Sequence, residues 1–204
     1  MLFDTAWPET KTFFPLLFDH LETNSYRNLN ILIIGGADGK FVIPLAKFSD
    51  KITVLEPDNS CFVDSPDFES LPSKIAKHGL RGVEIYQVDL QNFQTDEKYD
   101  LILTSCSWHY SRNKEFGIWN FVDKILAFSR SDTILFLEYM MPSENWHLQE
   151  ERYLQEQQLT DYISKKEIVQ IEYSFYTDKF PEKAHFAVPY DHFHKMGVLM
   201  AKVV

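Results

Sequence analysis

Residues 31–40 read ILIIGGADGK, an apolar run that passes directly into a glycine-rich turn. Such a run is typical of a strand that is buried on both faces of a parallel sheet. Glycine adopts positive φ angles and lets a ligand approach the backbone closely, so the turn predicts a binding site at the carboxyl end of this strand. A helix is expected next, over Phe41–Phe48, with Pro44 in its first turn, where N–H groups lack intrahelical partners.

The same alternation of short apolar runs and longer mixed segments continues along the chain. The runs expected to be strands are Asn30–Ile34, Ile52–Leu55, Val83–Val88, Tyr99–Thr104, Thr133–Leu137, Ile168–Phe175 and Gly197–Val203. Segments long enough for helical crossovers separate the first five runs, which predicts a doubly wound α/β sheet with helices on both faces. The last two runs are expected to pair antiparallel. Further helices are predicted to begin just before Pro15 and, with Ser143 as N-cap, to cover Glu144–Ser164.

Composition narrows the class of protein. The 204 residues include 20 Lys and Arg against 30 Asp and Glu, a net charge of −10, and 45% are hydrophobic, which predicts one globular domain, 1–204. An acidic chain without a basic cluster disfavours nucleic acid as a partner, and no apolar run approaches the ~18 residues of a membrane helix. The N-terminus lacks a positive leader, and Cys61 and Cys106 form no CxxC motif. These features predict a cytoplasmic protein with free thiols.

Two common nucleotide motifs do not fit the glycine turn. The dinucleotide fingerprint GxGxxG, placed from Gly35, needs glycine at Ala37 and glycine or alanine at Lys40. The P-loop needs Gly-Lys followed by Ser or Thr, and no such sequence follows the turn. A nicotinamide, flavin or nucleoside triphosphate enzyme is therefore disfavoured.

Acidic residues end the next two predicted strands. Glu56 lies 21 residues after Gly35, where a carboxylate can accept hydrogen bonds from both hydroxyls of a ribose. Asp89 ends the third predicted strand and can accept a hydrogen bond from the amino group of adenine. Because the carboxyl ends of parallel strands meet at one edge of a sheet, these features are expected to converge on one nucleotide site.

Four segments in this order resemble the motifs of class I S-adenosylmethionine-dependent methyltransferases: Gly35–Gly39, Val54–Asp58, Val88–Leu90 and Tyr99–Ser105. The resemblance covers roughly 30–140 and implies a mostly parallel seven-stranded sheet of order 3-2-1-4-5-7-6 with an antiparallel last strand. On this basis 1–29 would be an N-terminal helical cap, 30–140 the cofactor-binding core, and 141–204 an acceptor-side helix with the closing strands.

The resemblance also assigns a cofactor, S-adenosylmethionine, and the residues that would bind it. The turn would line the methionine part, the second strand end the ribose, the third the adenine, and the fourth the sulfonium. In that order the residues are Gly35, Gly36, Ala37, Asp38 and Gly39; Glu56, Pro57 and Asp58; Asp89 and Leu90; Ser105 and Cys106.

The chain departs from the family pattern at two positions of the turn. Ile33 stands where the family usually has an acid that anchors the ammonium of the cofactor, a role that Asp38 could take over. Ala37 stands where glycine is usual, which is tolerable if φ is negative there. The Gly-Gly-x-Asp-Gly form also resembles spermidine synthases, although Thr104–Ser107 lacks the carboxylate with which those enzymes deprotonate an amine. Aminopropyl transfer and a degenerate, non-catalytic scaffold are the alternatives to methyl transfer.

The acceptor side carries weaker signals. His109 and Tyr110 follow the fourth strand and are the candidate catalytic residues. His109 is the leading candidate for a general base, although it could equally pack or cap a helix. His192 and His194 have strand spacing that could suit a metal, but with no cysteine or carboxylate cluster they are expected to be surface histidines. The Asp/Asn-Pro-Pro-Tyr motif that amino-DNA methyltransferases of this family carry after the fourth strand is absent, which disfavours a DNA acceptor. The prediction is metal-independent methyl transfer to a small-molecule or peptide acceptor, with no membrane partner.

Overall fold

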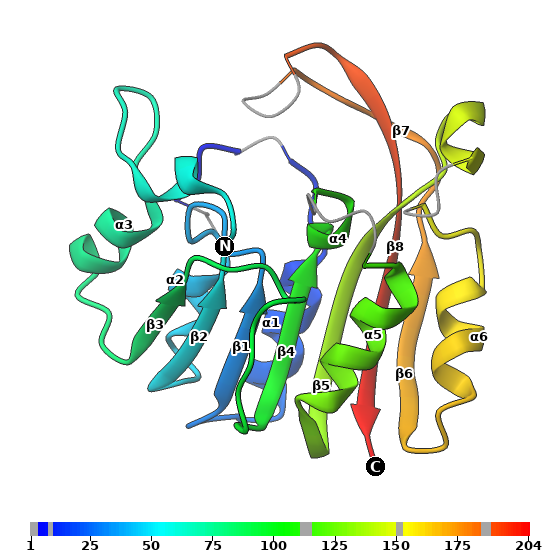
Figure 1. Ribbon diagram of the computed structural model, residues 1–204, viewed down its shortest axis with the longest axis horizontal. Helices are drawn as coiled ribbons and strands as arrows, with labels where there is room; N and C mark the ends of the chain where they lie inside the picture. Colours follow the sequence, from blue (N-terminus) through cyan, green and yellow to red (C-terminus); the bar gives the residue numbers. More distant parts are fainter. Residues whose placement is uncertain (1–3, 8–9, 111–115, 150–152, 185–188) are drawn as a thin grey trace.

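The computed structural model describes residues 4–7, 10–110, 116–149, 153–184 and 189–204. Its centre is one eight-stranded sheet of order β3-β2-β1-β4-β5-β8-β6, with β7 paired to β8 (Figure 1). The strands are β1 (Asn30–Ile34), β2 (Lys51–Leu55), β3 (Val83–Tyr86), β4 (Tyr99–Ser105), β5 (Ser129–Met141), β6 (Val169–Tyr176), β7 (Phe180–Glu182) and β8 (His192–Val203). The first five are parallel, and β8 runs antiparallel to its neighbours β5, β6 and β7. The predicted α/β sheet and its closing antiparallel pair are confirmed.

The register brings the carboxyl ends of the central strands to one edge. Ile34 of β1 pairs with Leu55 of β2 on one side and with Thr104 of β4 on the other. Ser105 of β4 pairs with Glu138 of β5. The residues that follow β1, β2 and β4 therefore start from the same level, as Figure 1 shows at the upper edge of the sheet.

Helices cover both faces of this sheet. The helical elements are α1 (Phe14–Thr23), α2 (Val42–Leu45), η1 (Asn59–Phe62), α3 (Leu71–Lys77), α4 (Ser107–Tyr110), α5 (Ile118–Ala127), η2 (Asn145–Gln149) and α6 (Gln158–Ser164). Ile31 and Ile33 of β1 pack in one apolar cluster with α1, α2 and α3, whereas Leu32 and Ile34 pack in a second cluster with α4, α5 and α6. Alternate side chains of one continuous apolar run thus supply both cores, as expected of a buried parallel strand.

The sheet differs from the predicted one by an added strand. β7 pairs only with the outer part of β8, from Phe180 opposite His194 to Glu182 opposite His192. This pairing also makes β8 longer than the predicted run, because it begins at His192 rather than at Gly197. The remaining strands follow the inferred order, with β8 in the place of the seventh strand. The sequence did not indicate this longer β8, because its first residues alternate between polar and apolar side chains. Such alternation is typical of the half-exposed end of an antiparallel strand and does not form a continuous apolar run.

The predicted polar helix 144–164 is wrong in extent. The described part consists of the short η2 and, later, α6, which begins only at Gln158. Ser143 and Glu144 donate their backbone N–H groups to Nδ1 of His147, so the chain closes into a tight turn there. Gln157 has φ 69°, a left-handed conformation that a helix cannot continue through. Within the described ranges, no helix is both long enough and apolar enough to cross a membrane.

Candidate functional site

A cavity of about 310 Å³ opens at the carboxyl ends of β1, β2, β3 and β4. It brings together most of the residues predicted to bind the cofactor: Gly35, Ala37, Glu56, Pro57, Asp58, Asp89, Leu90, Ser105 and Cys106. This volume lies at the lower end of the range typical of small-molecule sites. The predicted convergence of three strand ends on one site therefore holds in the folded chain.

The glycine turn needs glycine for close packing. Gly35 has φ 84°, and a Cβ there would lie 2.7 Å from Cβ of Ser107. A Cβ on Gly36 would lie 2.2 Å from Cγ1 of Val54, so Gly36 seats the turn on β2 instead of lining the cavity. Gly39 likewise lies behind the cavity, with φ 88°. The turn is thus shaped by three glycines, of which Gly35 faces the cavity.

Two other residues in the cavity wall have a strained backbone. Ala37 has φ 45° and Cys106 has φ 57°. The condition under which alanine would be tolerated without strain, a negative φ, is therefore not met at Ala37. A left-handed conformation costs an L-residue about 1–2 kcal/mol, and such strain tends to persist at functional sites. At Ala37 the left-handed conformation turns the backbone N–H toward Glu56. This N–H donates a 2.7 Å hydrogen bond to the Glu56 carboxylate.

Glu56 links the glycine turn to the loop after β2. Its Oε2 accepts from Ala37 N, and its Oε1 accepts from Asp58 N at 2.9 Å. The side chain is buried, and burial raises the pKa of this carboxyl, an effect that the Asp58 and Ala37 N–H groups partly offset. A carboxylate offers about four lone-pair positions, so it retains capacity for further donors on the cavity side. The geometry fits the predicted ribose contact but adds a structural role.

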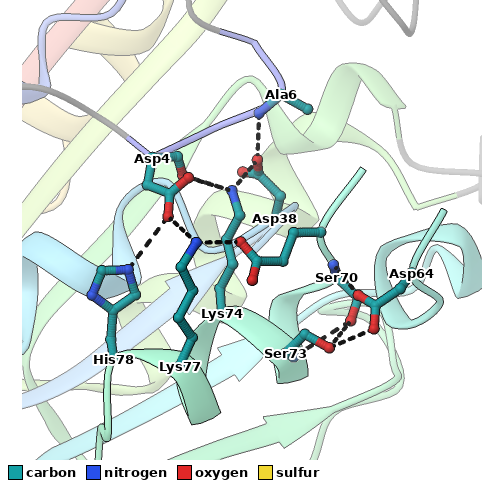
Figure 2. A network of polar contacts seen from close by, with 10 residues as sticks. Asp4, Ala6, Asp38, Asp64, Ser70, Ser73, Lys74, Lys77 and His78 are labelled. Carbon is teal, nitrogen blue, oxygen red and sulfur yellow. Dashed lines mark hydrogen bonds and ion pairs between the residues drawn. The ribbon is translucent and has the colours of Figure 1, made fainter. Parts of the chain in front are cut away.

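Asp38 does not line the cavity. Its carboxylate is fully buried, forms a 2.8 Å ion pair with Lys74 Nζ and accepts from Ala6 N at 2.7 Å (Figure 2). It also accepts from Thr5 Oγ1 at 3.1 Å. Lys74 Nζ also donates to the carbonyl of Asp4 at 2.6 Å. Asp38 is thus committed to holding the N-terminal segment, so it is not placed to substitute for the acid missing at Ile33.

The N-terminal segment, defined here as the described residues of 4–12, forms one wall of the cavity. Trp7, Thr10, Lys11 and Thr12 line it. The segment is held at its far end by Glu138, which accepts from Thr12 Oγ1 at 2.9 Å and from the N–H of Phe13. No motif in the sequence marks these residues as part of the site, because their position depends on long-range contacts to Asp38 and Glu138.

A buried cation lies in the same wall. Lys40 lines the cavity and is 7% exposed. Burial lowers the pKa of its ammonium, while the nearby carboxylates of Glu138 and Asp38 act in the opposite direction. The sequence pattern identifies Lys40 only as a mismatch to the dinucleotide fingerprint and does not predict that it lines the site. In the structure its ammonium lies in the cavity wall near these protein carboxylates.

His109 lies outside the cavity wall. It is 8% exposed and packs against the rings of Trp108 and Tyr153, with centroids at 5.4 and 5.0 Å. Successive helical residues are rotated by ~100°, so α4 places Ser107 toward the cavity and His109 away from it. The structure thus favours the packing role for His109. The side chain of Tyr110 lies outside the described residues. Burial raises the pKa of the Cys106 thiol, which disfavours it as a nucleophile.

Both histidines of β8 are half-buried, and of the two only His194 lines the cavity. His194 lines the cavity, its side chain is 13% exposed, and its Nε2 lies 3.2 Å from Oε2 of Glu182 on β7. Glu182 lines the cavity as well and is 7% exposed. The absence of a carboxylate was the ground for discounting a metal here, and Glu182 removes that ground. No sequence pattern predicts that Glu182 lies beside these histidines, because the strand that carries it has only three residues.

No protein-family model and no curated protein matches the sequence, but solved structures match the fold. TehB from Haemophilus influenzae superposes with a TM-score of 0.70 at 11% identity, over 96% of this chain and 64% of TehB. YcgJ from Bacillus subtilis gives 0.65 at 11% identity, over 92% and 95% of the two chains. The N-methyltransferase NodS from Bradyrhizobium japonicum gives 0.61 at 14% identity, over 92% and 93%. The fold is that of the class I S-adenosylmethionine-dependent methyltransferases.

Within this methyltransferase fold the added β7 stands out, because it brings Glu182 to the cavity without altering the order of the other strands. This chain spans only 64% of the length of TehB, whereas it spans nearly all of NodS. NodS also has a matching structure in complex with S-adenosyl-L-homocysteine, with a TM-score of 0.59. The likeness of the glycine turn to spermidine synthases stays a prediction.

Proposed function

We propose that this chain transfers a methyl group from S-adenosylmethionine to a small-molecule or peptide acceptor. The observation that carries the proposal is the meeting of Gly35, Glu56 and Asp89 in the wall of one cavity. The methyltransferase fold supports it, since ligands of open α/β sheets bind at this edge. The acidic composition of the chain favours an acceptor other than nucleic acid.

The residues present fit the cofactor. Gly35 leaves room where a Cβ would collide, Glu56 has lone pairs left for ribose hydroxyls, and Asp89 lies at the third strand end. Lys40 adds a cation to the same wall of the cavity, but a cation does not replace the acid missing at Ile33, whose partner is the ammonium of the cofactor. When bound, the cofactor supplies an electrophilic methyl group on sulfur. The protein's task is then alignment, because an in-line displacement depends chiefly on how the nucleophile is positioned.

Calorimetric titration of the purified chain with S-adenosylmethionine and S-adenosylhomocysteine tests the proposal. We expect saturable binding of both, at one molecule per chain. Absence of binding at millimolar concentration would overturn it. Binding of decarboxylated S-adenosylmethionine in preference to both would favour aminopropyl transfer, the reaction in which that compound is the donor.

A change at His109 separates packing from catalysis. Because its ring is buried between Trp108 and Tyr153, His109→Ala is expected to lower the free energy of unfolding by about 1–3 kcal/mol. Affinity for S-adenosylhomocysteine should be unchanged, because His109 does not line the cavity. Urea unfolding and calorimetry check the two statements. A fall in methyl transfer of about 10²–10⁴ without loss of stability would instead restore His109 as a general base.

A further inference from the structure

Three side chains with metal-binding atoms meet at the hairpin of β7 and β8. The carboxylate of Glu182 and the Nε2 atoms of His192 and His194 all lie within 4.8 Å of one another. Glu182 faces His192 in the strand pairing, and His194 follows on the same face of β8 two residues later. The paired ends of β7 and β8 rise above the upper edge of the sheet in Figure 1. Glu182 and His194, which these strands carry, line the cavity.

The ring of His192 is oriented as a ligand would be. Its Nδ1 lies 2.8 Å from the carbonyl oxygen of Tyr190. A carbonyl oxygen only accepts, so Nδ1 must carry the hydrogen of that bond. In the neutral ring Nε2 is then a bare lone pair, and it points at His194, 2.7 Å away. Histidine ligands of metals commonly donate their other ring N–H to a backbone carbonyl in this way, which fixes tautomer and orientation.

The distances come close to those of a tetrahedral site. Zinc–nitrogen bonds of about 2.0–2.1 Å at tetrahedral angles place two ligand atoms roughly 3.3 Å apart. The 3.2 Å between His194 Nε2 and Glu182 Oε2 meets this directly. The two imidazole nitrogens are 2.7 Å apart, which is shorter. To bind one ion, they would have to move apart by about 0.6 Å. One of the two rings would have to move by that amount to admit the ion.

We propose that Glu182, His192 and His194 bind a divalent transition-metal ion of the zinc class. Structural zinc sites have four protein ligands, whereas sites with three leave a position for water or substrate. Two of the three ligands here line the cavity, so a fourth ligand would reach the ion from the cavity. There the ion would bind a lone-pair atom of the acceptor and lower its pKa. That role rests on the proposed methyl transfer, whereas binding of the ion does not.

Calorimetry with Zn²⁺ on the full chain, stripped of metal by a chelator, tests the site without the cofactor. We expect one ion per chain and the release of protons when the donors of the site coordinate it. Glu182→Gln and His194→Gln each remove a direct ligand of the ion, so each should weaken Zn²⁺ binding by about 100-fold or more. Loss of a residue that only supports a ligand typically costs about 10–100-fold. His20→Gln is the matched control, since His20 lies on α1 against Tyr26, and it should leave binding unchanged. Circular dichroism checks that each variant is folded.

Absence of saturable Zn²⁺ binding would overturn the site, and the two histidines would then only share a hydrogen bond. Binding that survives Glu182→Gln, His192→Gln and His194→Gln would place the ion elsewhere and also overturn it. The two proposals fail separately. Zinc binding without cofactor binding removes methyl transfer alone, whereas cofactor binding without zinc binding removes the metal site alone.

Discussion

Replacing Lys74 by methionine is expected to lower the free energy of unfolding by about 3–5 kcal/mol, because it leaves the carboxylate of Asp38 buried without its counter-ion. The two side chains are 3% and 0% exposed, and their charged atoms lie 2.8 Å apart. Water cannot replace the lost partner at such a site. The N–H of Ala6 (Figure 2) and the hydroxyl of Thr5 remain as donors, but neither carries a charge.

Lys77→Met is the matched control on the same helix. Lys77 also forms ion pairs, with Asp4 and Glu69, but its side chain is 54% exposed. Pairs in water contribute about 0–1 kcal/mol, so this change should alter stability little. Adding Asp38→Asn to Lys74→Met should recover part of the loss, since the buried charge is then gone. Urea unfolding measures all four proteins, and equal losses for Lys74→Met and Lys77→Met would contradict the argument.

The same lysine connects stability to the site. Lys74 holds the carbonyl of Asp4 as well as Asp38, so it fixes the start of the N-terminal segment that walls the cavity. Lys74→Met should therefore also weaken cofactor binding, whereas Lys77→Met should not. The buried pair thus acts on function through the position of Trp7 and Thr10 rather than through contact with a ligand.

The parts of the fold and site that sequence predicted are those that local pattern determines. β1 matches its predicted bounds because five apolar or half-buried residues run straight into glycine. Glu56 and Asp89 were placed correctly because parallel strands must end at a common edge, whatever the rest of the chain does. Pro15 located the start of α1, since proline fits only in a first helical turn.

The parts that were missed depend on contacts between distant segments. Asp38 looked available to a ligand because nothing near it in sequence shows that Lys74 will bury beside it. Glu182 looked like one more surface acid until β7 paired with β8. The sequence correctly predicted that His109 follows the end of β4. It did not predict the direction of the side chain, because that depends on packing against Trp108 and Tyr153. The positive φ of Ala37 is a property of the closed turn, held by its bond to Glu56.

Glu56→Ala is expected to reduce affinity for S-adenosylhomocysteine by roughly tenfold to a hundredfold for each ribose hydroxyl that it binds, since a hydrogen bond to a charged group contributes about 1.5–3 kcal/mol. The same change leaves the N–H groups of Ala37 and Asp58 without their acceptor. Some loss of stability must therefore accompany the loss of affinity, and affinity alone does not separate ribose binding from repositioning of the turn.

A cofactor analogue without ribose hydroxyls makes that separation. Wild type should bind 2′,3′-dideoxy S-adenosylhomocysteine much more weakly than the parent compound, whereas Glu56→Ala should bind the two about equally, because neither hydroxyl then has a carboxylate to meet. Glu84→Ala, at an exposed position of β3, is the control and should discriminate as wild type does. Calorimetry well below the melting temperature of each variant gives the four affinities. If Glu56→Ala still prefers the ribose compound by the wild-type factor, Glu56 serves only to join the glycine turn to the loop after β2, and another group of the cavity must hold the sugar.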